Sequence, residues 1–331
     1  MGEKVRAVTI YSLGHFLVDF ACAFAMFRHA AGLPGWPTAV LMYNFLAFAG
    51  QMPVGLLADL WGNGRIFAGA GCFLAAAAFL LPGEPLLLAV TAGLGNALYH
   101  IGGGYDVLSF SGKKAGLLGV FVSPGALGLF LGTVLGRGSF SAAVPPILLL
   151  ACGAAILLLC GGMRPGAVAF DLTGTGVAAL AALFLVVCVR SYAGFLFAFP
   201  WKKGLWSWAF VLCVVLGKTA GGFLYDRWGG RSASLASLGL AAALFCVSGN
   251  PVAGCLAVLL FNMSMPVTLR AAADLLPGAK GFSFGLLTFA LFLGFLPAYL
   301  AIPGVSAGWM YAVLSLLSAA LLAAALGRRR P

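Results

Sequence analysis

Charged residues are scarce in this chain of 331 residues, and acidic ones are the scarcest. Only 8% of the residues are charged, with 8 acidic side chains against 19 lysines and arginines, whereas 62% are hydrophobic. Soluble globular proteins are typically about 25% charged and about 45–50% apolar. The composition therefore excludes an ordinary soluble protein and indicates an integral membrane protein.

Two kinds of chemical motif are also missing. The eight cysteines are scattered singly, without a Cys-x-x-Cys pair, so the sequence predicts neither a metal site nor a disulfide framework. No Gly-x-x-x-x-Gly-Lys-Ser/Thr string occurs, so no nucleotide-binding loop is predicted. We therefore expect no metal and no cofactor.

Long apolar runs make up most of the chain. A transmembrane helix needs about 20 apolar residues, and glycine, proline or charged clusters divide the sequence into twelve such runs. They are centred near residues 17, 48, 74, 96, 125, 153, 187, 215, 240, 262, 291 and 316. The runs lack the two-residue alternation of lipid-facing strands. We therefore expect an all-α polytopic membrane protein with twelve transmembrane helices.

The basic residues are distributed unequally between the two sides of the membrane. If twelve spans alternate, thirteen of the 19 lysines and arginines fall on one side and two, Arg190 and Lys218, lie within spans. Only Arg28, Arg137, Lys202 and Lys203 fall on the other side. Cytoplasmic loops carry the excess of lysine and arginine. We therefore expect both termini to be cytoplasmic, in a bacterial cytoplasmic membrane. The net charge of +11 is attributed to this orientation and not to binding of nucleic acid.

One string occurs twice in the sequence. Residues 55–65 read GLLADLWGNGR and residues 222–231 read GFLYDRWGGR, with five identities at a common offset of 167 residues. Because this offset is about half the chain, the sequence predicts two tandem copies of one unit. Six spans per copy give both copies the same orientation. We expect a six-helix bundle over 1–163, a short cytoplasmic linker over 164–176 and a second bundle over 177–331.

Each copy of the string forms a turn at the end of an apolar span. Its glycines tolerate the positive φ of a tight helix exit, whereas Asp59 and Asp226 lie at helix C-termini, where the dipole disfavours an anion. We expect each acid to face either the N-terminus of a neighbouring helix or an arginine such as Arg65 or Arg231. Such contacts can form in one conformation and break in another. The predicted cytoplasmic gate comprises Gly55, Asp59, Gly62, Arg65, Gly222, Asp226, Gly229 and Arg231.

The pattern Gly-x-x-x-Asp-x-x-Gly-x-x-Arg after the second span, echoed after the eighth, resembles the signature loop of the major facilitator superfamily. Residues 11–20, 97–104 and 111–128 are similar to the fosmidomycin-resistance type of drug exporter, although Ile101 replaces the proline that usually follows the second histidine. Span five resembles a degraded Gly-Pro motif of antiporters, for which a kinked, tightly packed helix is the alternative. The resemblance implies a monomer whose two halves rock about a midplane site.

In that superfamily fold, spans one, four, seven and ten line the central cavity, and the polar intramembrane residues fall on these spans. Such an ionisable residue costs roughly 2.5–3.5 kcal/mol on insertion scales and marks a functional site by default. His15 and Asp19 are four residues apart and share one helix face. We expect Asp19 to be the main proton-coupling acid, with His15 and His100 as titratable partners. The expected substrate-binding residues are Arg190, Asn96, Tyr99, Tyr192, Asn262 and Ser264.

Several of these residues have simpler interpretations. Asp19 and Arg190 could form a structural ion pair across the cavity, and His100 could hydrogen-bond a neighbouring helix. The stem of Lys218 could extend to the cytoplasmic edge. Arg270 and Asp274, near the cytoplasmic end of span ten, are assigned to loop packing. Tyr43, Asn44 and Gln51 in span two could either reach the cavity or form helix–helix hydrogen bonds.

The sequence predicts a proton-coupled secondary transporter, an exporter or antiporter of a small organic molecule, whose partners are its substrate, protons and lipid. A uniporter or importer of a small anion, with Arg190 as the anion ligand, is the alternative within transport. An enzyme such as an acyltransferase, with His100 and Asp106 as base and orienting group, requires the helix between them to break. A structural or signalling protein without transport activity fits the short loops but not the charges in the spans.

Overall fold

The structure is a computed structural model that describes residues 2–161, 167–170 and 172–327. Every regular element in these residues is a helix. Part of the expected linker over 164–176 lies outside the described residues, as do Arg164 and Arg328, Arg329 and Arg330, four of the thirteen basic residues assigned to the cytoplasmic side.

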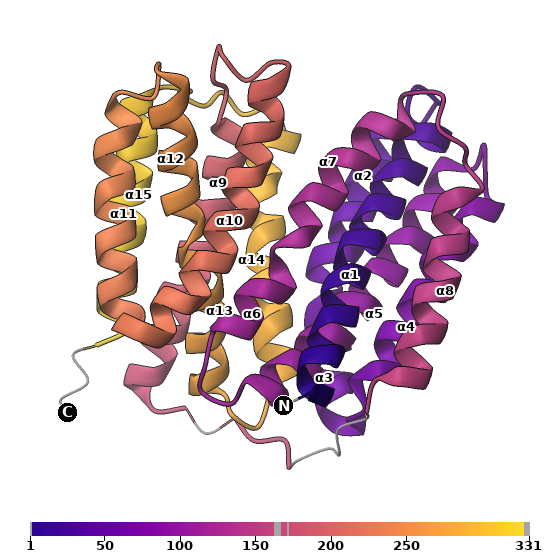
Figure 1. The fold of residues 1–331 in the computed structure, drawn as a ribbon, viewed down its shortest axis with the longest axis horizontal. Coiled ribbons are helices and arrows are strands. Elements are labelled where there is room, and N and C mark those ends of the chain that lie inside the picture. The colour runs from indigo at the N-terminus through magenta and orange to yellow at the C-terminus, as the bar shows by residue number, and fades with distance from the viewer. Residues whose placement is uncertain (1, 162–166, 171, 328–331) are drawn as a thin grey trace. The chain divides into compact units, whose positions relative to one another are not determined.

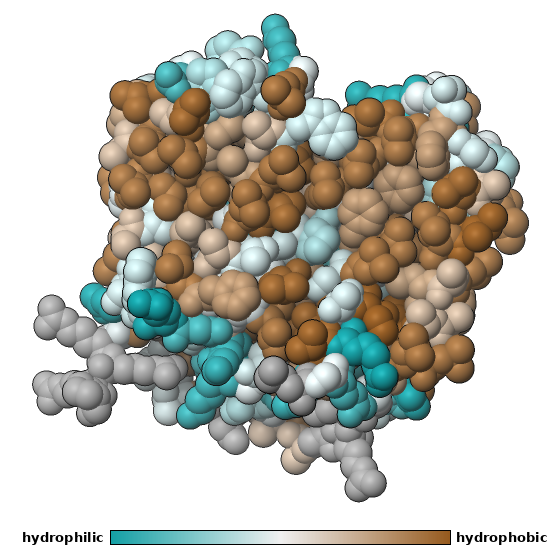
Figure 2. All heavy atoms as spheres, in the orientation of Figure 1, coloured by the Kyte–Doolittle hydropathy of each residue, from teal (hydrophilic) through white to brown (hydrophobic). Residues whose placement is uncertain are grey.

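The described helices match the predicted spans. Nine helical segments are at least 18 residues long and apolar enough to cross a membrane, and three shorter apolar helices cover Gly64–Leu80, Val144–Leu159 and Gly230–Cys246. Each predicted centre falls within one of these twelve segments. The face drawn in Figure 2 is hydrophobic along much of the helix flanks, and hydrophilic side chains gather near the helix ends. The prediction of an all-α integral membrane protein with twelve membrane helices is confirmed.

The chain divides into two compact units. The first unit comprises Met1–Gly112, Pro124–Ala169 and Gly278–Phe289. Its helices, drawn in Figure 1, are α1 (Gly2–Ala25), η1 (Met26–Ala30), α2 (Trp36–Asn44), η2 (Phe45–Ala49), α3 (Gln51–Trp61), α4 (Gly64–Ala77), η3 (Ala78–Leu80), α5 (Pro85–Ser111), α7 (Pro124–Gly136), α8 (Val144–Leu159) and the first half of α14 (Lys280–Tyr299).

The second unit comprises Lys113–Ser123, Phe170–Pro277 and Ala290–Pro331. Its helices are α6 (Gly116–Val122), α9 (Gly174–Leu196), α10 (Leu205–Trp228), α11 (Gly230–Cys246), α12 (Pro251–Asn262), α13 (Ser264–Leu275), the second half of α14 and α15 (Gly308–Ala325).

Two segments join the unit formed mainly by the other half of the sequence. Residues 113–123, which include α6, belong to the second unit, and residues 278–289, which begin α14, belong to the first. The fifth predicted span therefore passes from one unit to the other at the break between α6 and α7. The two contact units differ from the expected bundles over 1–163 and 177–331 because these two segments are exchanged. The expected boundaries stay a prediction.

Glycines bring the helices of the first unit close together. A Cβ on Gly71 or Gly102 would overlap the backbone of the facing helix at the contact between α4 and α5. On α7, Gly128 and Gly132 likewise lie against backbone carbonyl groups of α1. Small residues allow such close approach in membranes, where little hydrophobic effect operates between helices. Close packing of the glycines in the fifth span agrees with the simpler sequence interpretation.

Candidate functional site

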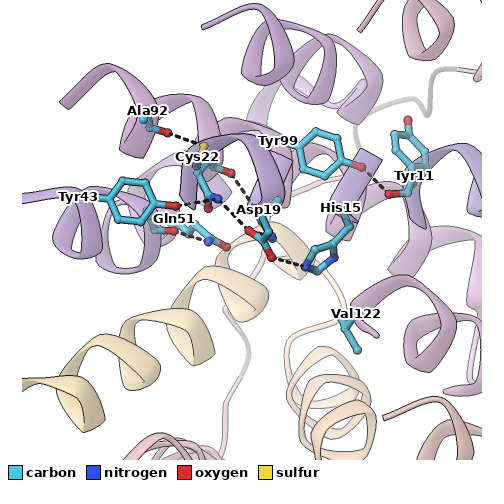
Figure 3. A network of polar contacts seen from close by, with 12 residues as sticks. Tyr11, His15, Asp19, Cys22, Tyr43, Gln51, Ala92, Tyr99 and Val122 are labelled. Atoms are coloured by element: carbon cyan, nitrogen blue, oxygen red, sulfur yellow. Dashed lines mark hydrogen bonds and ion pairs between the residues drawn. The ribbon is translucent and has the colours of Figure 1, made fainter. Parts of the chain in front are cut away.

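An acid and two histidines meet between α1 and α5 in the first unit. Asp19 Oδ2 lies 3.3 Å from Nε2 of His15, one turn earlier on α1, as drawn in Figure 3. Asp19 Oδ1 lies 3.6 Å from Nε2 of His100 on α5. The two imidazole rings meet edge to face with centroids 4.4 Å apart. The histidine side chains are 8% and 9% exposed, and that of Asp19 is 21% exposed. The three predicted proton-coupling residues therefore form one cluster.

Asn96 holds this cluster from α5. Its side-chain amide donates a hydrogen bond to Asp19 Oδ1 at 3.0 Å, and its backbone oxygen lies 2.8 Å from His100 Nδ1. Because a backbone oxygen only accepts, His100 Nδ1 carries the hydrogen, and Nε2 of the neutral ring presents a lone pair to Asp19. Two atoms with lone pairs thus face each other across 3.6 Å. A proton on His100 Nε2, or another cation between the two atoms, would stabilise this arrangement.

A glycine on α7 makes room for the cluster. A Cβ on Gly125 would overlap both Asp19 Oδ2 and His15 Nε2. Sequence reasoning placed Gly125 in an antiporter-like motif or a packed helix and missed its position over the acid. The small size of glycine indicated a close helix contact. Which residue of α1 faces Gly125 depends on the register of α7 against α1, which the sequence does not give.

A second buried acid lies further along α5. The hydroxyl of Tyr11 donates a 2.5 Å hydrogen bond to Asp106 Oδ2, and the Asp106 side chain is fully buried. Tyr99 is also fully buried, and its hydroxyl donates to the backbone oxygen of Tyr11 at 2.5 Å. These contacts fasten α5 to α1. The role of Tyr99 in substrate binding stays a prediction.

The arrangement of α5 argues against the enzyme alternative. This helix continues through Gly102–Gly104 without the break that a pairing of His100 with Asp106 requires. His100 contacts Asn96 and Asp19 among others, whereas Asp106 Oδ2 accepts a hydrogen bond from Tyr11. The two residues therefore do not form a base with its orienting group.

In the second unit, Arg190 is a buried cation. Its guanidinium Nη1 lies 3.3 Å from Thr268 Oγ1, which joins α9 to α13. The Arg190 residue is 8% exposed, and no carboxylate in the described part of this unit lies within 4.0 Å of its guanidinium. Asp19 belongs to the other unit, so the predicted attraction between these two groups stays a prediction.

The other predicted substrate-binding residues of the second unit lie on two spans. Asn262 and Ser264 flank the junction of α12 and α13 and bond the backbone of α12, Asn262 Nδ2 to Val258 O at 2.8 Å and Ser264 Oγ to Phe261 O at 3.0 Å. Tyr192 is half-buried on α9, two residues after Arg190. Their roles in binding also stay predictions.

The acid of the first repeated string caps a helix. Asp59, in the last turn of α3, accepts hydrogen bonds from the backbone N–H groups of Gly281 at 2.8 Å and Phe282 at 2.7 Å, in the first turn of α14. A Cβ on Gly55, one turn earlier, would overlap the backbone oxygen of Gly281. Glycine at this position therefore lets α14 approach closely enough for Asp59 to reach its N-terminus.

The second string repeats this arrangement. Asp226, near the end of α10, accepts hydrogen bonds from the backbone N–H groups of Ala115 at 2.6 Å and Gly116 at 3.0 Å, at the start of α6. A Cβ on Gly222 would overlap the backbone oxygen of Ala115. Of the two partners that the sequence left open, the structure has the helix N-terminus in both copies, where the dipole favours an anion.

The remaining gate residues shape the turns and bind other helices. Gly62 and Gly229 have the expected positive φ, at 65° and 77°. Arg65 Nη1 lies 3.2 Å from the backbone oxygen of Cys160 after α8, and Arg231 Nη1 lies 3.0 Å from that of Ala323 in α15. The arginines thus bind carbonyl groups at helix C-termini, where cations are favoured.

Lys218 has a more specific position than the sequence suggested. Its Nζ lies 3.3 Å from the backbone oxygen of Val122, the last residue of α6. Its side chain therefore binds the carbonyl end of that helix, at the break before Pro124. Arg270 and Asp274 pair at 2.7 Å within α13, on the span and not in a loop.

The polar residues of span two have separate partners. Asn44 and Gln51 donate to backbone oxygens of their own span. Tyr43 lies 3.4 Å from the amide nitrogen of Asn96, which places its hydroxyl beside the histidine cluster. The expected helix–helix hydrogen bond is therefore present for Tyr43 alone of these three.

Neither a family model nor a curated protein matches the sequence. The structure is similar to a variant of the fucose:proton symporter of E. coli, with a TM-score of 0.70 and 14% identity over 97% of this chain and 98% of that chain. A second structure of that symporter, a major facilitator superfamily transporter in the outward conformation, has a TM-score of 0.65 and 13% identity over the same shares.

A bacterial homologue of the iron transporter ferroportin, in an outward-facing state, has a TM-score of 0.59 and 17% identity over 96% of this chain and 97% of that chain. All three likenesses extend over nearly the whole length of both proteins. This chain therefore has the twelve-helix fold of the major facilitator superfamily.

Proposed function

We propose that the chain is a secondary active transporter of the major facilitator superfamily, coupled to protons, that moves a small organic molecule by alternating access. The observation that carries this proposal is the cluster of His15, Asp19 and His100 within membrane-spanning helices. Ionisable groups in a membrane are costly and mark functional sites by default. The fold, shared with a fucose:proton symporter, supports the transport class.

Asp19 is the proposed proton carrier. It is faced by His15 from its own helix, by His100 and Asn96 from α5, and by Gly125 from α7. Within the described first unit, no lysine or arginine forms an ion pair with Asp19. Of the side chains that pair with Asp19 in that unit, the two histidines can carry a balancing positive charge, and each does so by binding a proton. A proton gained or lost changes the charge of the cluster.

The two aspartate caps are proposed to be the cytoplasmic gate. Each acid binds the first turn of a helix that begins after a loop and belongs to the other half of the sequence. Contacts of this kind form or break as a unit when packed helices slide. We propose that both caps form when the cytoplasmic side is closed and separate when it opens. The direction of transport, as an exporter or antiporter, rests on the sequence resemblance alone.

One observation favours a second candidate, a uniporter or importer of a small anion. Arg190 is a buried guanidinium whose described hydrogen-bond partner is the neutral hydroxyl of Thr268. Buried charges are normally paired, and a carboxylate or phosphate on the substrate would supply the missing partner with bidentate geometry.

Reconstitution tests both candidates. The purified protein is placed in liposomes that enclose a pH-sensitive dye, and a panel of small organic molecules and anions is offered in turn. We expect at least one compound to move protons with wild type but not with Asp19→Asn. Glu84→Gln, which alters an exposed acid at the start of α5, should behave as wild type.

Substrate flux that is independent of pH, with Asp19→Asn moving the compound equally well, would disprove the coupling role. For the second candidate, Arg190→Lys should keep part of an anion flux and Arg190→Gln should abolish it. Equal anion flux in both variants would exclude Arg190 as the anion ligand.

A further inference from the structure

We propose that His15, Asp19 and His100 form a binding site for one divalent transition-metal ion of the Zn²⁺, Fe²⁺ or Co²⁺ class. The scattered cysteines of the sequence predict no metal site. The two histidines lie 85 positions apart, and only the packing of α5 on α1 brings them to the same acid. The proposal rests on the contacts of the first unit and does not depend on transport.

The distances fit a single metal ion. The three residues offer one ligand atom each, and these atoms all lie within 4.8 Å of one another. Metal–nitrogen and metal–oxygen bonds of about 2.0–2.2 Å place neighbouring ligands of a tetrahedral site about 3.4 Å apart. The observed 3.3 Å from His15 to Asp19 and 3.6 Å from His100 to Asp19 lie close to this value. The two distances end on different oxygens of Asp19, so the ion would be held by both oxygens or by one of them after the carboxylate turns.

The ligand types select a class of metal. Two imidazoles and one carboxylate are the ligand set of the facial triad of non-haem iron and of three-ligand zinc sites, which leave further positions open. Ca²⁺ and Mg²⁺ prefer oxygen ligands only, and Cu⁺ prefers sulfur. The cluster therefore favours a divalent first-row ion of intermediate softness.

The surroundings of the ligands also match a metal site. Histidine ligands usually donate their other N–H to a carbonyl or carboxylate, which fixes the tautomer and directs the lone pair to the metal. His100 does this through Nδ1 and the backbone oxygen of Asn96 at 2.8 Å. The side-chain amide of Asn96 bonds Asp19 Oδ1 at 3.0 Å, as ligating carboxylates are also held. One residue thus orients two of the three ligands.

The absence of a side chain at Gly125 keeps α7 from obstructing the ligand atoms of Asp19 and His15. Gly125 contributes no side chain on the face of α7 that lies against Asp19 Oδ2 and His15 Nε2. Asp19, at 21% exposed, is the accessible member of the cluster, whereas the two histidines are nearly buried. An ion would therefore arrive at the carboxylate first and be enclosed by the imidazoles.

The chain contains its own control. His29 is the one histidine of the chain outside the cluster. It lies in η1, next to Arg28 in the sequence, and its ring centroid is 6.0 Å from that of Phe79. It belongs to no group of three described residues that could hold a metal. Removing His29 therefore tests whether binding arises from histidine in general or from the cluster.

The test is titration of the purified full-length protein in detergent with Co²⁺, followed by its visible absorption, and with Zn²⁺, followed by calorimetry. We expect one ion per chain in wild type. His15→Gln, His100→Gln and Asp19→Asn should each weaken binding at least tenfold, whereas His29→Gln should bind as wild type. Wild type without saturable binding at one ion per chain would overturn the proposal. Wild-type affinity in both His15→Gln and His100→Gln would also overturn it. So would a loss of affinity in His29→Gln as large as the loss in these two variants.

A second variant keeps the test decisive if a glutamine variant fails to fold. His100→Cys retains a ligand of similar reach, and its complex with Co²⁺ should acquire a near-ultraviolet sulfur-to-cobalt charge-transfer band. The same titration of wild type, which keeps eight cysteines elsewhere, gives the reference spectrum. Bound Co²⁺ without a new band in His100→Cys would show that residue 100 does not coordinate the metal. Metal binding and proton movement are measured separately, so failure of one proposal leaves the other standing.

Discussion

Replacing Asp59 by asparagine should release the first turn of α14. Asp59 accepts two hydrogen bonds from backbone N–H groups, at 2.8 and 2.7 Å, and hydrogen bonds to charged groups contribute about 1.5–3 kcal/mol each. The interaction with the helix dipole adds roughly 0.3–1 kcal/mol. Asparagine keeps one acceptor oxygen but loses the second bond and the charge. The free energy that holds the first turn of α14 closed should therefore fall by about 2–3 kcal/mol. This is roughly 30- to 150-fold in the equilibrium constant for opening that turn.

The assay is hydrogen–deuterium exchange of the amides at residues 280–284 and 115–118. In Asp59→Asn, exchange at 280–284 should be faster by up to that factor, while the start of α6 keeps the wild-type rate. Asp226→Asn should show the reverse pattern. Glu84→Gln is the matched control, because Glu84 precedes α5 at the capping position but its side chain makes no capping hydrogen bond.

Two outcomes would refute this reasoning. Unchanged exchange at residues 280–284 in Asp59→Asn would show that the acid does not hold the first turn of α14. Equal acceleration at both helix starts would show a general loosening of the protein and not the loss of one cap.

Two further predictions concern packing in the first unit, one with a control variant on α11 of the second unit, and both are measured as thermal unfolding in detergent by tryptophan fluorescence. Gly55→Ala would press a methyl group against the backbone of α14 and should destabilise by about 1–3 kcal/mol. Gly239→Ala, at a helical position with no neighbour within 4 Å, should not destabilise the protein. Equal stability of the two variants would contradict the close approach of α14 to Gly55. Tyr11→Phe removes one hydrogen-bond donor of buried Asp106 and should destabilise the protein by about 1–3 kcal/mol. Tyr105→Phe, whose hydroxyl has no described hydrogen bond, should be neutral, and an unaffected Tyr11→Phe would show that Asp106 does not need this donor.

Features that depend on local physics were predictable from the sequence. The twelve apolar segments follow from the length that a helix needs to cross a bilayer. The anomaly of an acid at a helix C-terminus limited the partner of Asp59 and Asp226 to a helix N-terminus or an arginine, and the structure has the helix N-terminus. The pairing of His15 with Asp19 followed from their spacing on one helix face.

Features that depend on how helices are rotated against one another were not predictable. The hydrogen bond from Tyr11 to Asp106 and the position of Gly125 over Asp19 require the register of α1 against α5 and α7. Sequence spacing gives the face of a residue on its own helix but not what that face meets. The assignment of 113–123 and 278–289 to the other unit has the same cause, since contacts and not chain order decide it.

The most direct test of the central claim compares two transport modes in proteoliposomes that contain Asp19→Asn, with a substrate found by the pH-dye panel. Exchange of labelled for unlabelled substrate needs no net proton movement, whereas accumulation against a concentration gradient needs the proton gradient. If Asp19 carries the coupling proton, the variant should keep exchange and lose accumulation. Accumulation by Asp19→Asn at the wild-type level, driven by the same proton gradient, would contradict the account.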